Sequence, residues 1–157
     1  MTPRRAGPED VPALEALQHA AYATNRSLLG VEPLPLRADY SGMVGGREVW
    51  LFEGAAGLEG ALVLEPHNDH LLIWSVATAP TAQGHGLGNR MLQFAETRAC
   101  TLGLAEMRLY TGEKLATNIA WYRRRGYRID GHEALPDRIV VHMSKSLETP
   151  RLGSENG

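Results

Sequence analysis

In the first half of the chain, the spacing of apolar residues predicts one helix followed by three strands. They recur every three or four positions between Val11 and Ala21, which predicts an amphipathic helix from about Pro8 to Tyr22. Residues 24–46 are rich in proline and glycine and are expected to be mostly loop, with at most a short helix near 37–44. Apolar runs joined by short turns predict an antiparallel meander, with strands at 48–53, 61–65 and 70–77 after a short first strand at 4–5.

The second half alternates between helical and strand patterns. A long amphipathic helix is expected over 89–104, and a shorter one over 116–125. A strand, a helix and a strand in succession imply a right-handed crossover, so Trp74–Ala77 and Met107–Tyr110 are predicted to be parallel neighbours. Further strands are predicted at 127–130 and 138–144, on either side of a turn at 131–137.

Composition narrows the class of protein. The 157 residues suffice for one ordinary domain, and the formal net charge of −2 disfavours a strongly basic nucleic-acid binder. Neither a signal peptide nor an apolar run long enough for a membrane span is found, so a soluble cytoplasmic protein is expected. The single cysteine, Cys100, is read as a small core residue, and the six histidines lack metal-ligand spacing, so no metal site is predicted.

The segment 83–88, Gln-Gly-His-Gly-Leu-Gly, carries the strongest chemical signal. It joins a buried strand to a helix, where glycines let backbone N–H groups converge and the helix start favours negative charge. Such a turn suits a phosphate or pyrophosphate. A P-loop is excluded because no Gly-Lys-Ser/Thr follows, and a dinucleotide fingerprint would need glycine where Asn89 stands. A turn required only for tight packing is the structural alternative.

The same segment resembles the Gln/Arg-x-x-Gly-x-Gly/Ala loop of the GNAT acetyltransferase superfamily, through Gln83, Gly86 and Gly88. The flanking stretches 76–80 and 89–104 are similar too, as are 108–111, 118–127 and 141–145, so the resemblance covers 70–147. It implies an α/β fold with a mixed, mainly antiparallel sheet of six or seven strands and helices on both faces. One domain is then expected over 1–147, followed by a flexible tail at 148–157.

The resemblance also implies an N-acetyltransferase that uses acetyl-CoA, wedged between two diverging strands. By that resemblance Tyr122 is the general acid and the Val76 N–H binds the thioester oxygen, whereas the alternatives are a core tyrosine and an ordinary buried strand. Asn118 is assigned either to the coenzyme or to helix capping, and the arginines at 123–125 either to the 3′-phosphate or, preferably, to a solvated helix end. The coenzyme-binding residues implied are Val76, Thr78, Gln83, Gly84, His85, Gly86, Leu87, Gly88, Asn89 and Asn118.

The general base and the acceptor stay open at this point. Many similar proteins carry an acid two residues before the position of Val76, where this chain has Trp74. The acceptor is expected to be a small-molecule or peptide amine, and an arylamine would need less help from a base. A non-catalytic acyl-CoA-binding regulatory domain and an enzyme with a longer acyl donor are the alternatives, and a homodimer is left open. Candidate bases without geometry are Glu32, Glu65, His70 and His142.

Overall fold

The computed structural model describes residues 2–33, 38–55 and 57–147, so the tail predicted at 148–157 lies outside the described residues. The described chain forms a seven-stranded sheet with the order β1-β2-β3-β4-β5-β7-β6. Only β4 and β5 pair in parallel; the other neighbours are antiparallel. The strands are β1 (Arg4–Arg5), β2 (Glu48–Gly54), β3 (Gly57–Pro66), β4 (Leu71–Thr78), β5 (Glu106–Gly112), β6 (Arg128–Leu135) and β7 (Arg138–Ser146).

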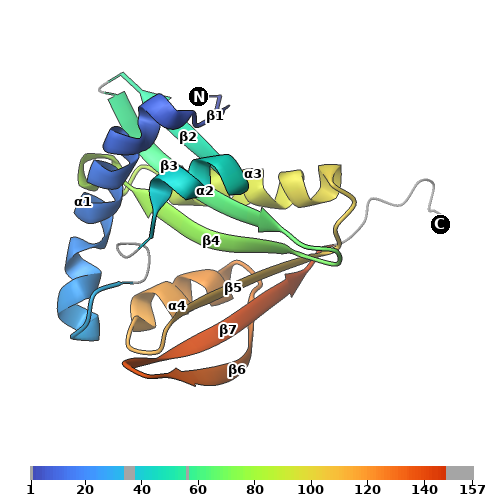
Figure 1. Ribbon diagram of the computed structural model, residues 1–157. Coiled ribbons are helices and arrows are strands. Elements are labelled where there is room, and N and C mark those ends of the chain that lie inside the picture. Colours follow the sequence, from blue (N-terminus) through green and yellow to red (C-terminus); the bar gives the residue numbers. More distant parts are fainter. Residues whose placement is uncertain (1, 34–37, 56, 148–157) are drawn as a thin grey trace.

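Helices cover both faces of the sheet, as expected (Figure 1). Alternation along the strands explains this: Val49 and Leu51 of β2 pack toward α1 and α2, whereas Phe52 packs toward α3. Each face therefore has its own hydrophobic core, and no described helix is long and apolar enough to cross a membrane. The helices are α1 (Val11–Leu29), α2 (Tyr40–Gly46), α3 (Leu87–Thr101) and α4 (Ala116–Arg124), with single 3₁₀ turns η1 (Pro8–Asp10) and η3 (Pro80–Ala82).

Three expectations about local structure were wrong. Helix α1 continues past Tyr22 to Leu29, because the first residue to break it is Gly30, whose φ is +73°. Strand β6 occupies most of the predicted turn, and only residues 136–137 connect it to β7. This mostly exposed edge strand has no alternating apolar pattern to reveal it. Cys100 is exposed, because its neighbour Ala99 takes the buried position on α3.

Strands β4 and β5 diverge after a short paired segment (Figure 1). They pair only through Leu71–Ile73 and Met107–Leu109, so the pairing predicted for residues 74–77 was three residues too late. A bulge explains the divergence: Val63 of β3 pairs with Ser75 and Leu64 with Ile73, which leaves Trp74 as an extra residue. Bulges bend the strand that carries them, and here the bend begins where the β4–β5 pairing stops. The result is a fork between the two strands.

Candidate active site

The glycine loop has a backbone conformation that requires glycine at two positions. Gly84 and Gly86 have φ values of +84° and +79°, in the left-handed region that side chains with a Cβ rarely adopt. Gly86 directly precedes α3 and makes no side-chain cap, so the first N–H groups of the helix have no partner within it. The Gln83 amide donates to the Thr78 carbonyl at 3.4 Å, which ties the loop to the end of β4. This arrangement suits an anion.

A large cavity of about 940 Å³ runs from this loop into the fork. Its walls include every predicted coenzyme-binding residue except His85, whose carbonyl instead accepts a bond from Arg90. The role of His85 at the coenzyme therefore stays a prediction. The lining residues from the predicted set are Val76, Thr78, Gln83, Gly84, Gly86, Leu87, Gly88, Asn89 and Asn118.

Helix α4 closes the cavity on its other side. Trp121 lies against Gly88, where an added Cβ would come within 3.4 Å of the indole ring. Arg125 donates to Asn89 and its guanidinium lies 4.6 Å from the centre of the Trp121 ring, so α4 is fastened to the start of α3. Asn118 does not cap this helix, contrary to one interpretation, because the capping position belongs to Leu115.

Two cations lie on the cavity wall, of which Lys114 had no predicted role and Arg124 was assigned either to the 3′-phosphate or, preferably, to solvent. Lys114 and Arg124 both line the large cavity, where their charge complements a polyphosphate. Lys114 lies in a segment that reads as a simple turn, and Arg124 belongs to the arginine run assigned preferentially to solvent. Lys114 just before α4 and Arg124 at its end both line the cavity, a placement that local sequence alone does not decide.

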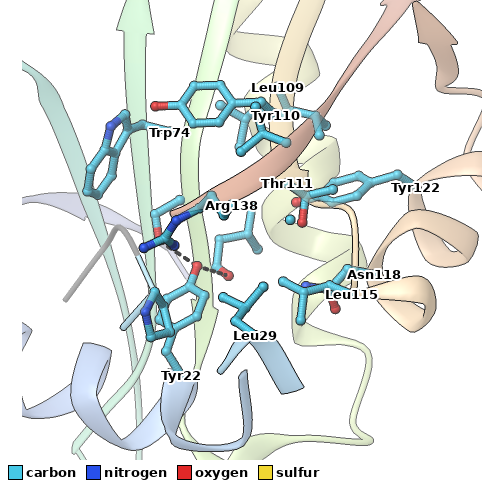
Figure 2. A pocket seen from close by; sticks show the side chains of 16 residues that line it. Tyr22, Leu29, Trp74, Leu109, Tyr110, Thr111, Leu115, Asn118, Tyr122 and Arg138 are labelled. Atoms are coloured by element: carbon cyan, nitrogen blue, oxygen red, sulfur yellow. Dashed lines mark hydrogen bonds between the residues drawn. The ribbon is translucent and has the colours of Figure 1, made fainter. Parts of the chain in front are cut away.

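A second, smaller cavity of about 110 Å³ lies beside Tyr122 (Figure 2). Both cavities share Tyr22, Val76, Leu115, Asn118 and Tyr122 among their lining residues. These residues come from α1, β4, the start of α4 and α4 itself, so the two cavities meet at the fork. Tyr22, where the predicted first helix was expected to end, lies within the longer α1 and reaches the junction.

Tyr122 and Tyr22 present hydroxyl groups at this junction. Burial raises the pKa of Tyr122 above its ordinary value of 10.0, so the phenol remains protonated at neutral pH. The Tyr22 hydroxyl lies 2.9 Å from the Ser75 hydroxyl and donates to the Val76 carbonyl at 3.3 Å (Figure 2). Ser75 in turn contacts the fully buried Gln18. A hydrogen-bonded chain thus fixes β4 at the fork.

None of the four candidate bases lines either cavity. Glu65 accepts a bond from Arg47 at 2.8 Å, and His70 and His142 each pair with a neighbouring carboxylate. The Glu32 carbonyl accepts from Arg138. Trp74, which takes the place of the expected acid, lines the small cavity. Its ring meets Tyr40 edge-on, with the centroids 6.3 Å apart.

Comparison with known proteins decides the family. A family model described as "Acetyltransferase (GNAT) domain" matches residues 45–129, which is more than half of the chain. The chain belongs to the GNAT acetyltransferase family. The seven-stranded sheet with helices on both faces is thus a GNAT fold, and acetyl-CoA is the co-substrate that membership of this acetyltransferase family implies.

The relatives of this GNAT protein are themselves named as acetyltransferases. An "IAA acetyltransferase" of Azospirillum brasilense is 32% identical over 90 residues, which are 56% of this chain and 59% of the relative. The match therefore spans less than two thirds of that relative's length. Among solved structures, an IAA acetyltransferase from Bacillus cereus matches with a TM-score of 0.67 and 19% identity, covering 93% of this chain and 99% of that one. The PaiA N-acetyltransferase of Thermoplasma acidophilum, solved with coenzyme A, matches with a TM-score of 0.76 and 15% identity over 92% and 98%.

Proposed function

We propose that this protein is an N-acetyltransferase that transfers the acetyl group of acetyl-CoA directly to a primary amine, with both substrates bound together. The observation that carries the proposal is the junction of the two cavities at Tyr122 and Val76. A long cavity that begins at an anion-binding loop suits the coenzyme, and a short one beside its far end suits the acceptor. Holding both in place makes the attack effectively unimolecular.

The coenzyme is held from the loop toward the fork. The N–H groups at the start of α3 bind the pyrophosphate, and Lys114 and Arg124 add complementary charge. We assign the thioester oxygen to the Val76 N–H. In an antiparallel ladder the N–H and C=O of one residue face the same side, and the Val76 carbonyl is reached by Tyr22, which lines the fork. A backbone N–H aimed at this oxygen stabilises the charge that develops there.

Tyr122 is assigned as the general acid. When the amine nitrogen attacks the thioester carbonyl, a C–N bond forms and the C–S bond breaks, so sulfur needs one proton while nitrogen must lose one. Tyr122 stays protonated at neutral pH because burial raises its pKa, so it has a proton to give to sulfur. A proton from nitrogen, passed through water, restores the phenol.

The same geometry also suits a regulatory domain that binds acyl-CoA without turning it over. The specific observation in favour of this second candidate is that, among the described residues, no carboxylate or imidazole lines either cavity. The names of the relatives described above do not identify an amine acceptor. Turnover separates the two candidates.

Replacing Tyr122 tests both the enzyme and its acid. With acetyl-CoA and a panel of amines, thiol release is expected from the wild type, and Tyr122→Phe should lower kcat by about 100-fold. The affinity for acetyl-CoA should remain within about twofold, since the ring is kept. A matched control is Tyr127→Phe, which removes only the hydroxyl bonded to Glu96 at 2.9 Å and should keep kcat.

Two outcomes would contradict the proposal in different ways. Tight binding of acetyl-CoA without turnover of any amine would favour the regulatory domain. A Tyr122→Phe variant as fast as the wild type would remove the acid role while leaving the transferase standing.

A further inference from the structure

The small cavity beside Tyr122 combines aromatic walls with a single buried cation. Tyr22, Trp74, Tyr110 and Tyr122 contribute rings, and most of the remaining wall is aliphatic. Figure 2 shows the Arg138 side chain reaching from β7 among these rings. Apart from the tyrosines, Arg138 is the only titratable residue among the described residues that line the cavity. Its surroundings therefore favour a flat, largely apolar acceptor that carries some negative charge.

The absence of a base along these walls restricts the amine. An alkyl amine with a pKa near 10.4 is neutral in only about one molecule in 10³ at pH 7. Entry into an apolar cavity disfavours its ammonium form further, because burial penalises charge. In the part of the lining that the structure describes, no carboxylate or imidazole is present to take the proton away. An aromatic amine avoids this difficulty, because its nitrogen lone pair is delocalised into the ring and it is neutral at pH 7.

Hydrogen bonds within the protein use only part of the Arg138 guanidinium. Its side chain is only 5% exposed, and Nε and Nη2 donate to the two carboxylate oxygens of Asp137, each at 3.0 Å. Nη2 also donates to the Glu32 carbonyl at 2.6 Å. Within the described part of the chain, no partner is found for Nη1. A guanidinium N–H that is not used within the protein can donate to a carboxylate of a ligand in the cavity, so Arg138 is suited to an anionic group.

We propose that the acceptor is a primary aromatic amine that bears a carboxylate. Its ring lies between the aromatic walls, its carboxylate accepts from Arg138 Nη1, and its amine faces Tyr122. The reaction converts the amine and the thioester into an N-aryl acetamide and free thiol: a C–N bond replaces the C–S bond, and one proton moves from nitrogen to sulfur. This inference rests on the proposed function and names the substrate class of the same site.

Three probes test the two halves of the inference on the wild-type protein. They are 4-aminobenzoate, the uncharged 4-aminobenzamide, and 4-(aminomethyl)benzoate, which keeps the carboxylate but has an alkyl amine. Thiol release from acetyl-CoA at pH 7 should give 4-aminobenzoate a kcat/KM at least about tenfold above each of the others. That value should also be flat from pH 6 to 9. The aromatic amine is neutral throughout, and burial raises the pKa of each lining tyrosine above its ordinary value of 10.0.

A variant then isolates the cation. Arg138→Met should lower kcat/KM for 4-aminobenzoate by about 10- to 100-fold and leave that for 4-aminobenzamide within about threefold, because only the first probe carries the charge. A merely structural role for Arg138 would lower both alike. If this variant fails to fold, the wild-type comparison of the two probes still decides the matter.

The failures are distinguishable. Equal kcat/KM for 4-aminobenzoate and 4-aminobenzamide would overturn the carboxylate site, and faster turnover of 4-(aminomethyl)benzoate at pH 7 would overturn the aromatic amine. Acetylation of alkyl or peptide amines without any aromatic amine would sink this inference and leave the proposed function intact. Tight binding of acetyl-CoA with no turnover of any amine would instead remove the proposed function.

Discussion

Gly86 shows how a single backbone angle serves the coenzyme site. Its φ of +79° turns the chain into α3 and leaves the first N–H groups of that helix facing the large cavity. An L-residue with a Cβ meets a steric penalty of about 1–2 kcal/mol in this region. The demand for glycine is therefore conformational, since the nearest atom that an added Cβ would meet, in Arg90, is 3.8 Å away.

Gly86→Ala is expected to lower the free energy of unfolding by about 1–2 kcal/mol and to weaken acetyl-CoA binding. Urea denaturation and isothermal titration measure the two effects. The matched control is Gly45→Ala in α2, where an added Cβ meets nothing within 4 Å and φ is not positive. That change should be neutral or stabilise the helix by up to about 1 kcal/mol. Equal effects at both glycines would contradict the argument.

The residues of the site were predictable only where their chemistry depends on the backbone. The glycine loop can be recognised in the sequence because its positive φ values require glycine at closely spaced positions. The sequence gives no such signal for Arg138. This residue lies on β7 and meets residues of the long α1 at the cavity, and the two elements are far apart in the chain. The acid expected at the position of Trp74 has no replacement in the sequence pattern, and none of the described residues along the cavity walls supplies one.

At the scale of elements, α3 is joined to the sheet by a charged contact as well as by its apolar face. Arg98 donates to both carboxylate oxygens of Glu48 on β2, at 2.9 and 2.8 Å, and Trp50 donates to the same carboxylate at 3.0 Å. These bonds, first among them those of Arg98, lower the pKa of Glu48 below its ordinary value of 4.5. The contact therefore stabilises the folded protein most where Glu48 is ionised in both states.

Arg98→Met is expected to lower the free energy of unfolding at pH 7 by about 1–3 kcal/mol. Because the pKa of Glu48 is lowered in the folded state, the stabilisation that this contact gives the wild type is lost as the pH falls below 4.5 and through that lowered value. The gap between wild type and variant, measured by urea denaturation from pH 7 to pH 3, should narrow accordingly. A gap that stays constant over that range would assign the loss to packing instead.

Elements with a regular apolar pattern were predicted well, and those without one were not. The meander of β2, β3 and β4 and the helix α3 follow from alternating or helical spacing. Strand β6 is an exposed edge strand, and the second half of α1 depends on where the helix is broken, so neither shows in the periodicity. The parallel pairing of β4 with β5 was expected, but its length was misjudged, since a bulge leaves no mark in the sequence.

At the scale of the whole molecule, the sheet consists of two parts joined by a short seam. Only three residue pairs connect β4 with β5, so β1–β4 and β5–β7 meet over a small part of their length. The large cavity is lined from both sides of that seam, by β4 and α3 on one and by α4 on the other. A ligand in it bridges the two parts and should stabilise them together.

Acetyl-CoA at 100 times its Kd is expected to stabilise the native state by about 2.7 kcal/mol. For a chain of this size that corresponds to a rise in Tm of about 5–10 °C, measured by a thermal melt with and without the ligand. The Gly86→Ala variant should show a smaller rise at the same concentration. No rise at millimolar acetyl-CoA would contradict the assignment of the cavity.

The extra residue of the bulge in β4 determines whether a cleft opens between β4 and β5. Ile73 and Ser75 already pair with consecutive residues of β3, so removing Trp74 would leave an uninterrupted ladder without shifting either flank. The shortened strand would have no bend to carry it away from β5, and hydrogen bonding between the two would be free to continue across the present opening. The rest of the sheet would keep its register. The substrate cleft of this protein therefore depends on the number of residues in one strand as much as on their identity.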